Sequence, residues 1–154
     1  MTTQYWLMKS EPDEFSLDDL KTVKKEAWSG VRNYQARNFM RDDMKKGDLV
    51  LFYHSSTRPP GIVGLAEVSK EAFPDDSAFN KKSQYFDPKS NPKKPRWYMV
   101  EIKYLKHFKN IITLDELKKE KALKDMIVTQ KGNRLSITPV KKSEYDHILK
   151  MAKA

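Results

Sequence analysis

The chain has 154 residues, and its 30 lysines and arginines outnumber its 21 aspartates and glutamates, which gives a formal net charge of +9. Charged residues make up 33% and hydrophobic residues 38%, a balance typical of a globular domain and not of a disordered chain. The absence of cysteine excludes disulfide bonds and thiolate metal sites. No apolar run approaches the roughly 20 residues of a transmembrane helix, and the N-terminus lacks a signal-peptide pattern. We expect one domain over residues 1–154 and no membrane partner.

Strands and short helices are expected in the first part of the chain. Pro12 ends the first strand because proline cannot pair within a central strand. Ser16 is a typical helix N-cap and precedes acidic residues in the first turn. The uninterrupted apolar run ahead of His54 indicates a strand buried on both faces. The expected elements are a strand at 5–8, a helix after Ser16 with Leu17, Leu20 and Val23 on one face, a short helix at 33–43, a turn at 45–48 and a strand at 49–54.

The second part of the chain contains further strands and a long irregular segment. Gly64 interrupts a strand pattern, which often marks a bulge. Thr113 and Glu116 have the spacing of a capping box. Prolines break up residues 71–95, and irregular segments of such length are usually functional or disordered. The expected elements are strands at 62–68, 97–105 and 135–140, a helical turn near 74–77, a helix after Thr113, a short helix near 122–126 and a helix capped by Ser143 that reaches 151.

Most of the expected strands follow one another directly along the chain, and helices do not alternate with them. This order favours an α+β fold with a mixed or antiparallel, barrel-like sheet over a doubly wound α/β fold.

Residues 28–41 concentrate the side chains that recognise nucleic acids. The segment contains three arginines, several amides and the rings of Trp28 and Tyr34. Arginine and amide groups bind base edges and phosphates, and aromatic rings stack on unpaired bases. With the positive net charge, this segment indicates a nucleic-acid-binding module.

A second basic cluster lies in residues 80–97, where Asp87 is the only acidic residue. Each lysine alone would fit a solvated loop. The aromatic rings among them favour a loop that faces phosphates. The basic residues are Lys81, Lys82, Lys89, Lys93, Lys94 and Arg96.

Sequence patterns for metal binding or catalysis are missing. The three histidines are far apart, and the sequence has no nucleophile elbow, phosphate loop or dinucleotide fingerprint. We therefore expect no metal and no cofactor. His54 ends a buried strand beside Ser55, so it is either a satisfied core histidine or a hydrogen-bonding group at the mouth of a pocket. Trp28 precedes Ser29 and Gly30 at a loop, and Trp97 begins a strand directly after a basic stretch, so these two are the better candidates for pocket-lining rings.

Several segments in order along the chain resemble the EVE domain family. The longest and most specific is residues 28–41. The others are 5–12, 47–55, 61–64, 85–90, 95–97 and 134–136. The resemblance implies a PUA-like fold, a small and highly curved mixed β-barrel with short peripheral helices, related to YTH and ASCH domains. It also implies a reader of modified bases in DNA or RNA, which composition alone does not indicate.

The hypothesis that follows is a nucleotide flipped out of its stack, at a cost of a few kcal/mol, with its base held in an aromatic-lined pocket. Candidate bases are 5-methylcytosine and 5-hydroxymethylcytosine in DNA. The expected pocket residues are Ser10, Trp28, Val31, Asn33, Tyr53, His54, Ser55 and Trp97. The expected phosphate-binding residues are Lys9, Arg32, Arg37, Lys89, Lys93, Lys94 and Arg96.

Two alternatives remain open from the sequence. One is an RNA-binding PUA-like module that acts on tRNA or rRNA. The other is an enzyme acting on a modified base or small nucleotide, with Glu11, Asp87 and His54 as acid–base candidates; the absence of metal ligands and of a nucleophile counts against it. We expect a monomer, cytoplasmic in a bacterium and nuclear in a eukaryote.

Overall fold

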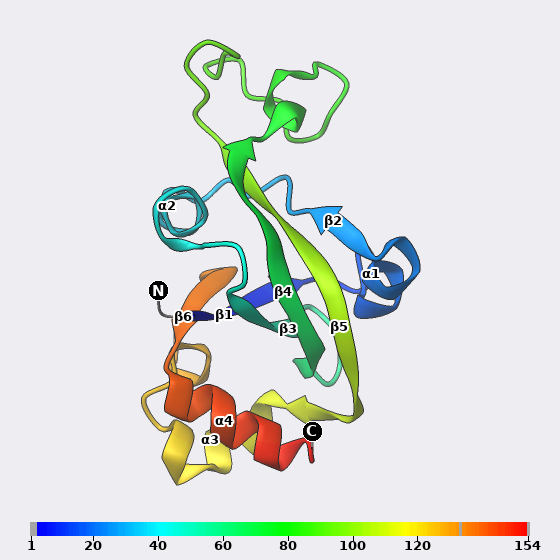
Figure 1. Cartoon of the computed structure of the whole chain (residues 1–154), viewed down its shortest axis with the longest axis vertical. Helices are drawn as coiled ribbons and strands as arrows, with labels where there is room; N and C mark the ends of the chain where they lie inside the picture. Colours follow the sequence, from blue (N-terminus) through cyan, green and yellow to red (C-terminus); the bar gives the residue numbers. More distant parts are fainter. Residues whose placement is uncertain (1–2, 133, 154) are drawn as a thin grey trace.

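The computed structural model describes residues 3–132 and 134–153, which form a six-stranded mixed sheet with short helices around it (Figure 1). The strand order is β2-β5-β4-β3-β1-β6. Neighbouring strands are antiparallel except β1 and β3, which are parallel. The predicted α+β class with a mixed sheet is thus confirmed. The strands are β1 (Tyr5–Ser10), β2 (Lys25–Ala27), β3 (Leu49–His54), β4 (Gly61–Pro74), β5 (Tyr98–Thr113) and β6 (Ile137–Val140).

The central strands are buried on both faces, as the apolar run before His54 predicted. Side chains alternate across a strand, so Val50 and Phe52 of β3 belong to one hydrophobic cluster. Leu51 and Tyr53 belong to a second cluster on the opposite face. The sheet therefore separates two hydrophobic cores.

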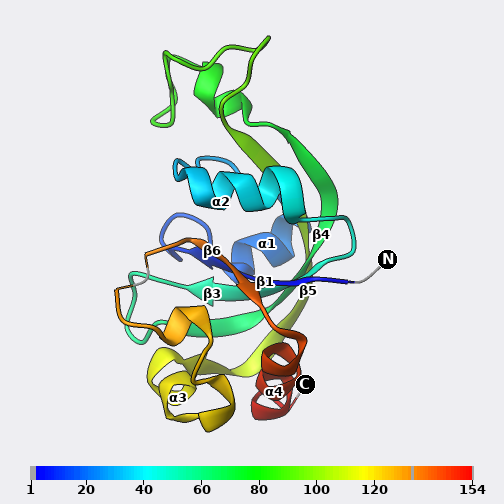
Figure 2. The same cartoon turned by 90° about the vertical axis from the view of Figure 1, so that its left-hand side faces the viewer.

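Each face of the sheet is covered by its own pair of helices (Figure 2). Buried residues of α1 and α2 enter the cluster that contains Phe52. Buried residues of α3 and α4 enter the cluster that contains Leu51. Within the described residues no helix is both long and apolar enough to cross a membrane. The helices are α1 (Leu17–Val23), α2 (Tyr34–Asn38), continued by a π-helical turn η1 (Phe39–Asp43), α3 (Leu114–Lys119) and α4 (Lys142–Met151), with 3-10 turns η2 (Asp76–Phe79), η3 (Lys121–Leu123) and η4 (Ile127–Thr129).

The β4–β5 hairpin is much longer than the sequence predicted. Polar residues on its exposed surface hide the strand pattern, and pairing between the two strands carries both of them far beyond the apolar stretches. Gly64 lies at a register shift, which confirms the predicted bulge. A side chain there would collide with the backbone carbonyl of Lys106 on β5. The segment 75–97 projects from one end of this hairpin (Figure 1), and its 3-10 turn η2 lies two residues beyond the predicted start of a helical turn.

Three other local predictions need correction. Strand β2 was missed because its three residues, Lys25, Glu26 and Ala27, form no strand pattern and owe their conformation to pairing with β5. Helix α4 is capped at Lys141 and not at Ser143, because the carboxylate of Glu144 accepts the backbone N–H of Lys141. Val23 is 51% exposed and does not share the buried face of α1.

Candidate nucleic-acid interface

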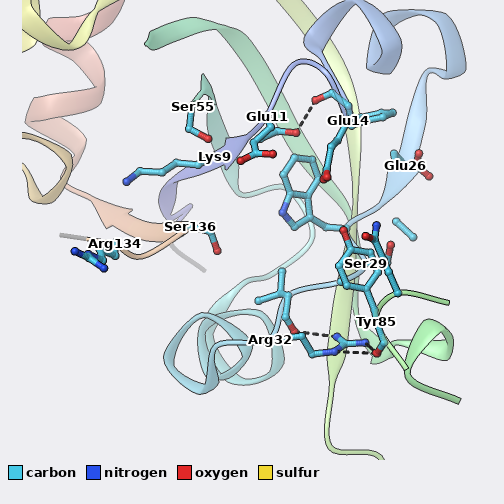
Figure 3. Close-up of a pocket in the computed structure, with 17 residues that line it drawn as sticks. Lys9, Glu11, Glu14, Glu26, Ser29, Arg32, Ser55, Tyr85, Arg134 and Ser136 are labelled. Carbon is cyan, nitrogen blue, oxygen red and sulfur yellow. Dashed lines mark hydrogen bonds between the residues drawn. The ribbon is translucent and has the colours of Figure 1, made fainter. Parts of the chain in front are cut away.

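A cavity of about 870 Å³ opens where β1 ends, beside the segment that follows β2 (Figure 3). Five separate stretches of the chain contribute to its lining, so the fold and not a single motif creates it. They are residues 9–11 with 14–15, residues 26–32, Ser55, residues 84–85, and Arg134 with Ser136.

Trp28 supplies the large aromatic surface of this cavity. Its ring packs edge-on against Phe15 and Phe52, with centroid distances of 6.3 and 5.7 Å, and only 8% of the residue is exposed. The indole Nε1–H has no hydrogen-bond partner among the described residues, whereas the indoles of Trp6 and Trp97 each donate to an aspartate. No buried side-chain polar atom in the described part of the chain lacks a partner. The Nε1–H of Trp28 therefore reaches solvent, as a free donor on a cavity-lining residue.

The wall formed by Ser29–Arg32 is held in place by a buried carboxylate. Asp75 is 0% exposed. Its Oδ2 accepts the backbone N–H of Gly30 at 2.7 Å and Nη1 of Arg32 at 3.2 Å, and its Oδ1 accepts the N–H and hydroxyl of Ser77. Arg32 also donates from Nη2 to the carbonyl of Tyr85 at 2.6 Å. This network fixes the cavity wall to the segment 75–97.

Gly30 lets the ring of Tyr85 close that wall. Its φ of +81° belongs to the left-handed region that favours glycine. A Cβ at this position would lie 2.6 Å from Cζ of Tyr85. The guanidinium of Arg32 lies over the same ring at 5.6 Å. Burial raises the pKa of Tyr85, so its phenol stays protonated and neutral at physiological pH.

The mouth of the cavity carries basic side chains on one side and acidic side chains on others. Lys9 and Arg134 lie on one side, and Glu11, Glu14 and Glu26 lie on others (Figure 3). Lys9 is half-buried and has no ion-pair partner within the described residues, and burial lowers its pKa. A phosphate beside Lys9 would offset that desolvation, while carboxylates can accept hydrogen bonds from the amino group of a base such as cytosine.

Six of the predicted binding residues do line this cavity. Ser10, Trp28, Val31 and Ser55 come from the expected base pocket, and Lys9 and Arg32 come from the expected phosphate-binding set. Ser10 donates its hydroxyl to the carbonyl of Phe15, which leaves its oxygen free to accept. Their roles toward a ligand stay predictions.

The other four expected pocket residues are placed elsewhere. Asn33 caps α2 by accepting the N–H of Ala36. Tyr53 is 3% exposed and packs in the opposite core. Nε2 of His54 accepts the N–H of Leu17 at the start of α1, at 3.1 Å. This bond fits the interpretation of His54 as a histidine with a satisfied hydrogen bond inside the fold. Trp97 is 5% exposed and donates from Nε1 to Asp87 at 2.7 Å.

The remaining expected phosphate-binding residues lie outside the cavity lining. Arg37 is engaged inside the protein, since it donates to the carbonyl of Arg96 and to the side chain of Asn38. Arg96 is 3.7 Å from the carboxylate of Asp87. The three lysines are exposed on the segment 75–97: Lys89, Lys93 and Lys94.

The acid–base candidates of the enzyme alternative do not meet. Glu11 lines the cavity, but His54 and Asp87 do not. Asp87 is occupied by Trp97 and by the backbone N–H of Lys89. In the ranges 3–132 and 134–153, no group of three histidine, aspartate or glutamate side chains could hold a metal ion.

Several residues that line the cavity were not predicted to belong to a pocket. Tyr85 and the stretch 134–136 were noted for their resemblance to the family, and no local pattern placed them near Trp28. The lining residues without a predicted pocket role are Glu14, Phe15, Glu26, Ala27, Ser29, Gly30, Gln84, Tyr85, Arg134 and Ser136.

Comparisons with known proteins show which family this chain resembles. The EVE domain family matches residues 4–151. Thymocyte nuclear protein 1 of mouse is 43% identical over 97% of this chain and 74% of its own length. A hypothetical protein from Leishmania major is 49% identical, with a TM-score of 0.94 over 99% of this chain and 96% of that one.

A third relative has been solved with nucleic acid. The structure of human THYN1 protein in complex with 5-methylcytosine-containing DNA is 39% identical to this chain. Its TM-score is 0.92 over 99% of both chains, in agreement with the expected PUA-like fold. The chain therefore belongs to the EVE domain family.

Proposed function

We propose that this protein is a nucleic-acid-binding reader that accommodates a flipped, modified base in the Trp28 cavity, with 5-methylcytosine in DNA as the base. The observation that carries the proposal is the unpaired indole N–H of a nine-tenths buried tryptophan on the lining of an open cavity. Burial of an amphipathic ring usually brings a partner for its polar atom. A bound base would supply that partner.

The relative solved with 5-methylcytosine-containing DNA supports the choice of ligand, because its likeness covers 99% of this chain. The proposal involves binding and no catalytic step. The naming of the eukaryotic relatives supports a nuclear location if this chain is eukaryotic.

The lining residues suggest how the base is held. The Nε1–H of Trp28 donates to a carbonyl or ring nitrogen of the base, and Lys9 and Arg134 hold the adjoining phosphates. Contact between Val31 and a methyl group adds roughly 0.8 kcal/mol, the value for burying one methylene-sized group. An open cavity whose walls are fixed by Asp75 needs little rearrangement to receive the base, which reduces the ordering cost of binding.

Calorimetric titration with matched oligonucleotides tests the proposal. The DNA set carries cytosine, 5-methylcytosine, 5-hydroxymethylcytosine, adenine or N6-methyladenine at one position, in single- and double-stranded form, and an RNA set repeats it. We expect tighter binding to DNA with 5-methylcytosine. Preference for the RNA set would favour the RNA-binding alternative, and equal binding to all members would refute the reader function.

A further inference from the structure

Tyr34 presents an aromatic ring to solvent beside the cavity wall. It is the first residue of α2, and it is 52% exposed. Its ring stacks on that of Trp97, with a centroid distance of 4.9 Å and an interplanar angle of 19°. One face of Tyr34 is therefore covered by a buried indole.

About half of Tyr34 remains exposed although Trp97 covers one face of its ring. The guanidinium carbon of Arg37 is 4.8 Å from the ring of Tyr34 and 6.0 Å from that of Trp97. A cation stacked on the outer face of Tyr34 would have the Tyr34 ring between itself and Trp97. Its distance from the Trp97 ring would be nearly twice the distance between the two rings. The guanidinium of Arg37 therefore lies beside the stacked pair and not beyond the outer face of Tyr34, and its bond to the carbonyl of Arg96 keeps it there.

The Tyr34–Trp97 pair is connected to the cavity through planar groups. The guanidinium of Arg32, a lining residue, lies 5.1 Å from the ring of Trp97 and 5.6 Å from that of Tyr85. The three successive distances, from Tyr34 to Trp97, from Trp97 to Arg32 and from Arg32 to Tyr85, are each shorter than 6 Å. A nucleic-acid strand with one base in the cavity would thus pass close to Tyr34.

We propose that Tyr34 is a second stacking platform, which binds an unpaired base that flanks the flipped nucleotide in the same strand. This inference rests on the proposed function and adds a second nucleotide to it. A flat ring with one face supported and the other exposed is the usual surface on which proteins stack unpaired bases. Arg37 flanks the platform, and the exposed Lys93 and Lys94 precede Trp97 in the sequence, so the surroundings are basic. The chemistry fits a polyanion and not an apolar peptide.

The test combines Tyr34→Ala with oligonucleotides that lack single bases. In single-stranded DNA with one 5-methylcytosine, an abasic site is placed at each of the three positions on either side. Tyr34→Ala should weaken binding about 5- to 150-fold, the range that base–aromatic stacking covers. It should leave the preference for 5-methylcytosine over cytosine unchanged, because the cavity is intact.

A double-mutant cycle identifies the stacked base. One abasic position should weaken wild-type binding by a similar factor and should not weaken Tyr34→Ala further. Tyr34→Trp should retain affinity, and Val23→Ala, which removes a side chain of equal exposure elsewhere, should bind like wild type. Thermal midpoints of all variants verify that they are folded.

The outcomes separate this inference from the proposed function. If wild-type protein shows no preference for 5-methylcytosine, the reader function is wrong whatever Tyr34 does. If the preference is present but Tyr34→Ala binds like wild type, the stacking platform is wrong. It is also wrong if, at every abasic position, the loss of affinity caused by Tyr34→Ala and the loss caused by the missing base are independent and multiply.

Discussion

Asp75 holds the cavity wall with both carboxylate oxygens, and replacing it by asparagine removes one of them. Four donors converge on Asp75: the backbone N–H groups of Gly30 and Ser77, the hydroxyl of Ser77 and the guanidinium of Arg32. An amide has one acceptor oxygen and one NH₂ group. In Asp75→Asn, either orientation of the amide therefore points donors at donors.

The cost of this substitution follows from the bonds that are lost. If the amide oxygen stays with Ser77, the bond to Gly30 is worth about 1 kcal/mol and the charge-assisted bond to Arg32 about 2 kcal/mol. Arg32 is 24% exposed in its side chain and keeps its bond to Tyr85, which limits the total. We expect a loss of about 2–4 kcal/mol in the free energy of unfolding. For a chain of this size that lowers the melting temperature by about 5–15 °C.

Denaturant unfolding and calorimetry of Asp75→Asn measure both quantities. The matched control is Asp76→Asn, the exposed neighbour in the sequence, which should change the free energy of unfolding by less than about 0.5 kcal/mol. The variant should also lose preference for the modified base, because the Gly30–Arg32 wall is no longer fixed. If Asp75→Asn unfolds like wild type, the carboxylate does not anchor this wall and the reasoning is refuted.

Three further predictions concern a glycine, a histidine and two lysines. Gly30→Ala should cost about 1–3 kcal/mol in denaturant unfolding, because its positive φ and the neighbouring ring both oppose a Cβ; Gly132→Ala, with open space around it, should cost less. Burial lowers the pKa of His54, so as the pH falls this histidine takes up its proton in the unfolded chain before it does so in the folded protein. The free energy of unfolding should therefore fall as pH drops below about 6.5. Melting curves of His54→Gln should show a weaker pH dependence. Replacing Lys93 and Lys94 by alanine should weaken binding to all oligonucleotides alike and flatten the salt dependence by up to about 2 log units per log unit of salt; an unchanged slope would mean that they touch no phosphate.

The sequence predicted the core elements well where burial produces a local pattern. The apolar run of β3 and the capping box at Thr113 are such patterns, and both occur in the structure. It did not predict β2 or the far ends of β4 and β5, because these strands depend on partners that are distant in the chain.

Only part of the candidate site was predicted, because its lining also comes from segments that are distant in the chain. Trp28 and Val31 belong to one aromatic and arginine-rich segment, so their neighbourhood was visible in the sequence. Trp97 was expected to line the pocket, but its ring is buried beneath the exposed ring of Tyr34. A single sequence does not show which of two stacked rings lies outside.

The role of Trp28 is tested most directly by the ratio of dissociation constants for DNA with cytosine and with 5-methylcytosine. It is measured by calorimetry for wild type, Trp28→Phe and Trp28→Ala, with Trp97→Phe as the control for loss of an indole outside the cavity. We predict a ratio above 1 for wild type and for the control. Trp28→Phe, which loses the N–H donor, should have reduced overall affinity. Trp28→Ala should have a ratio of 1. A wild-type ratio of 1, or an undiminished ratio in folded Trp28→Ala, would contradict a modified-base reader built around Trp28.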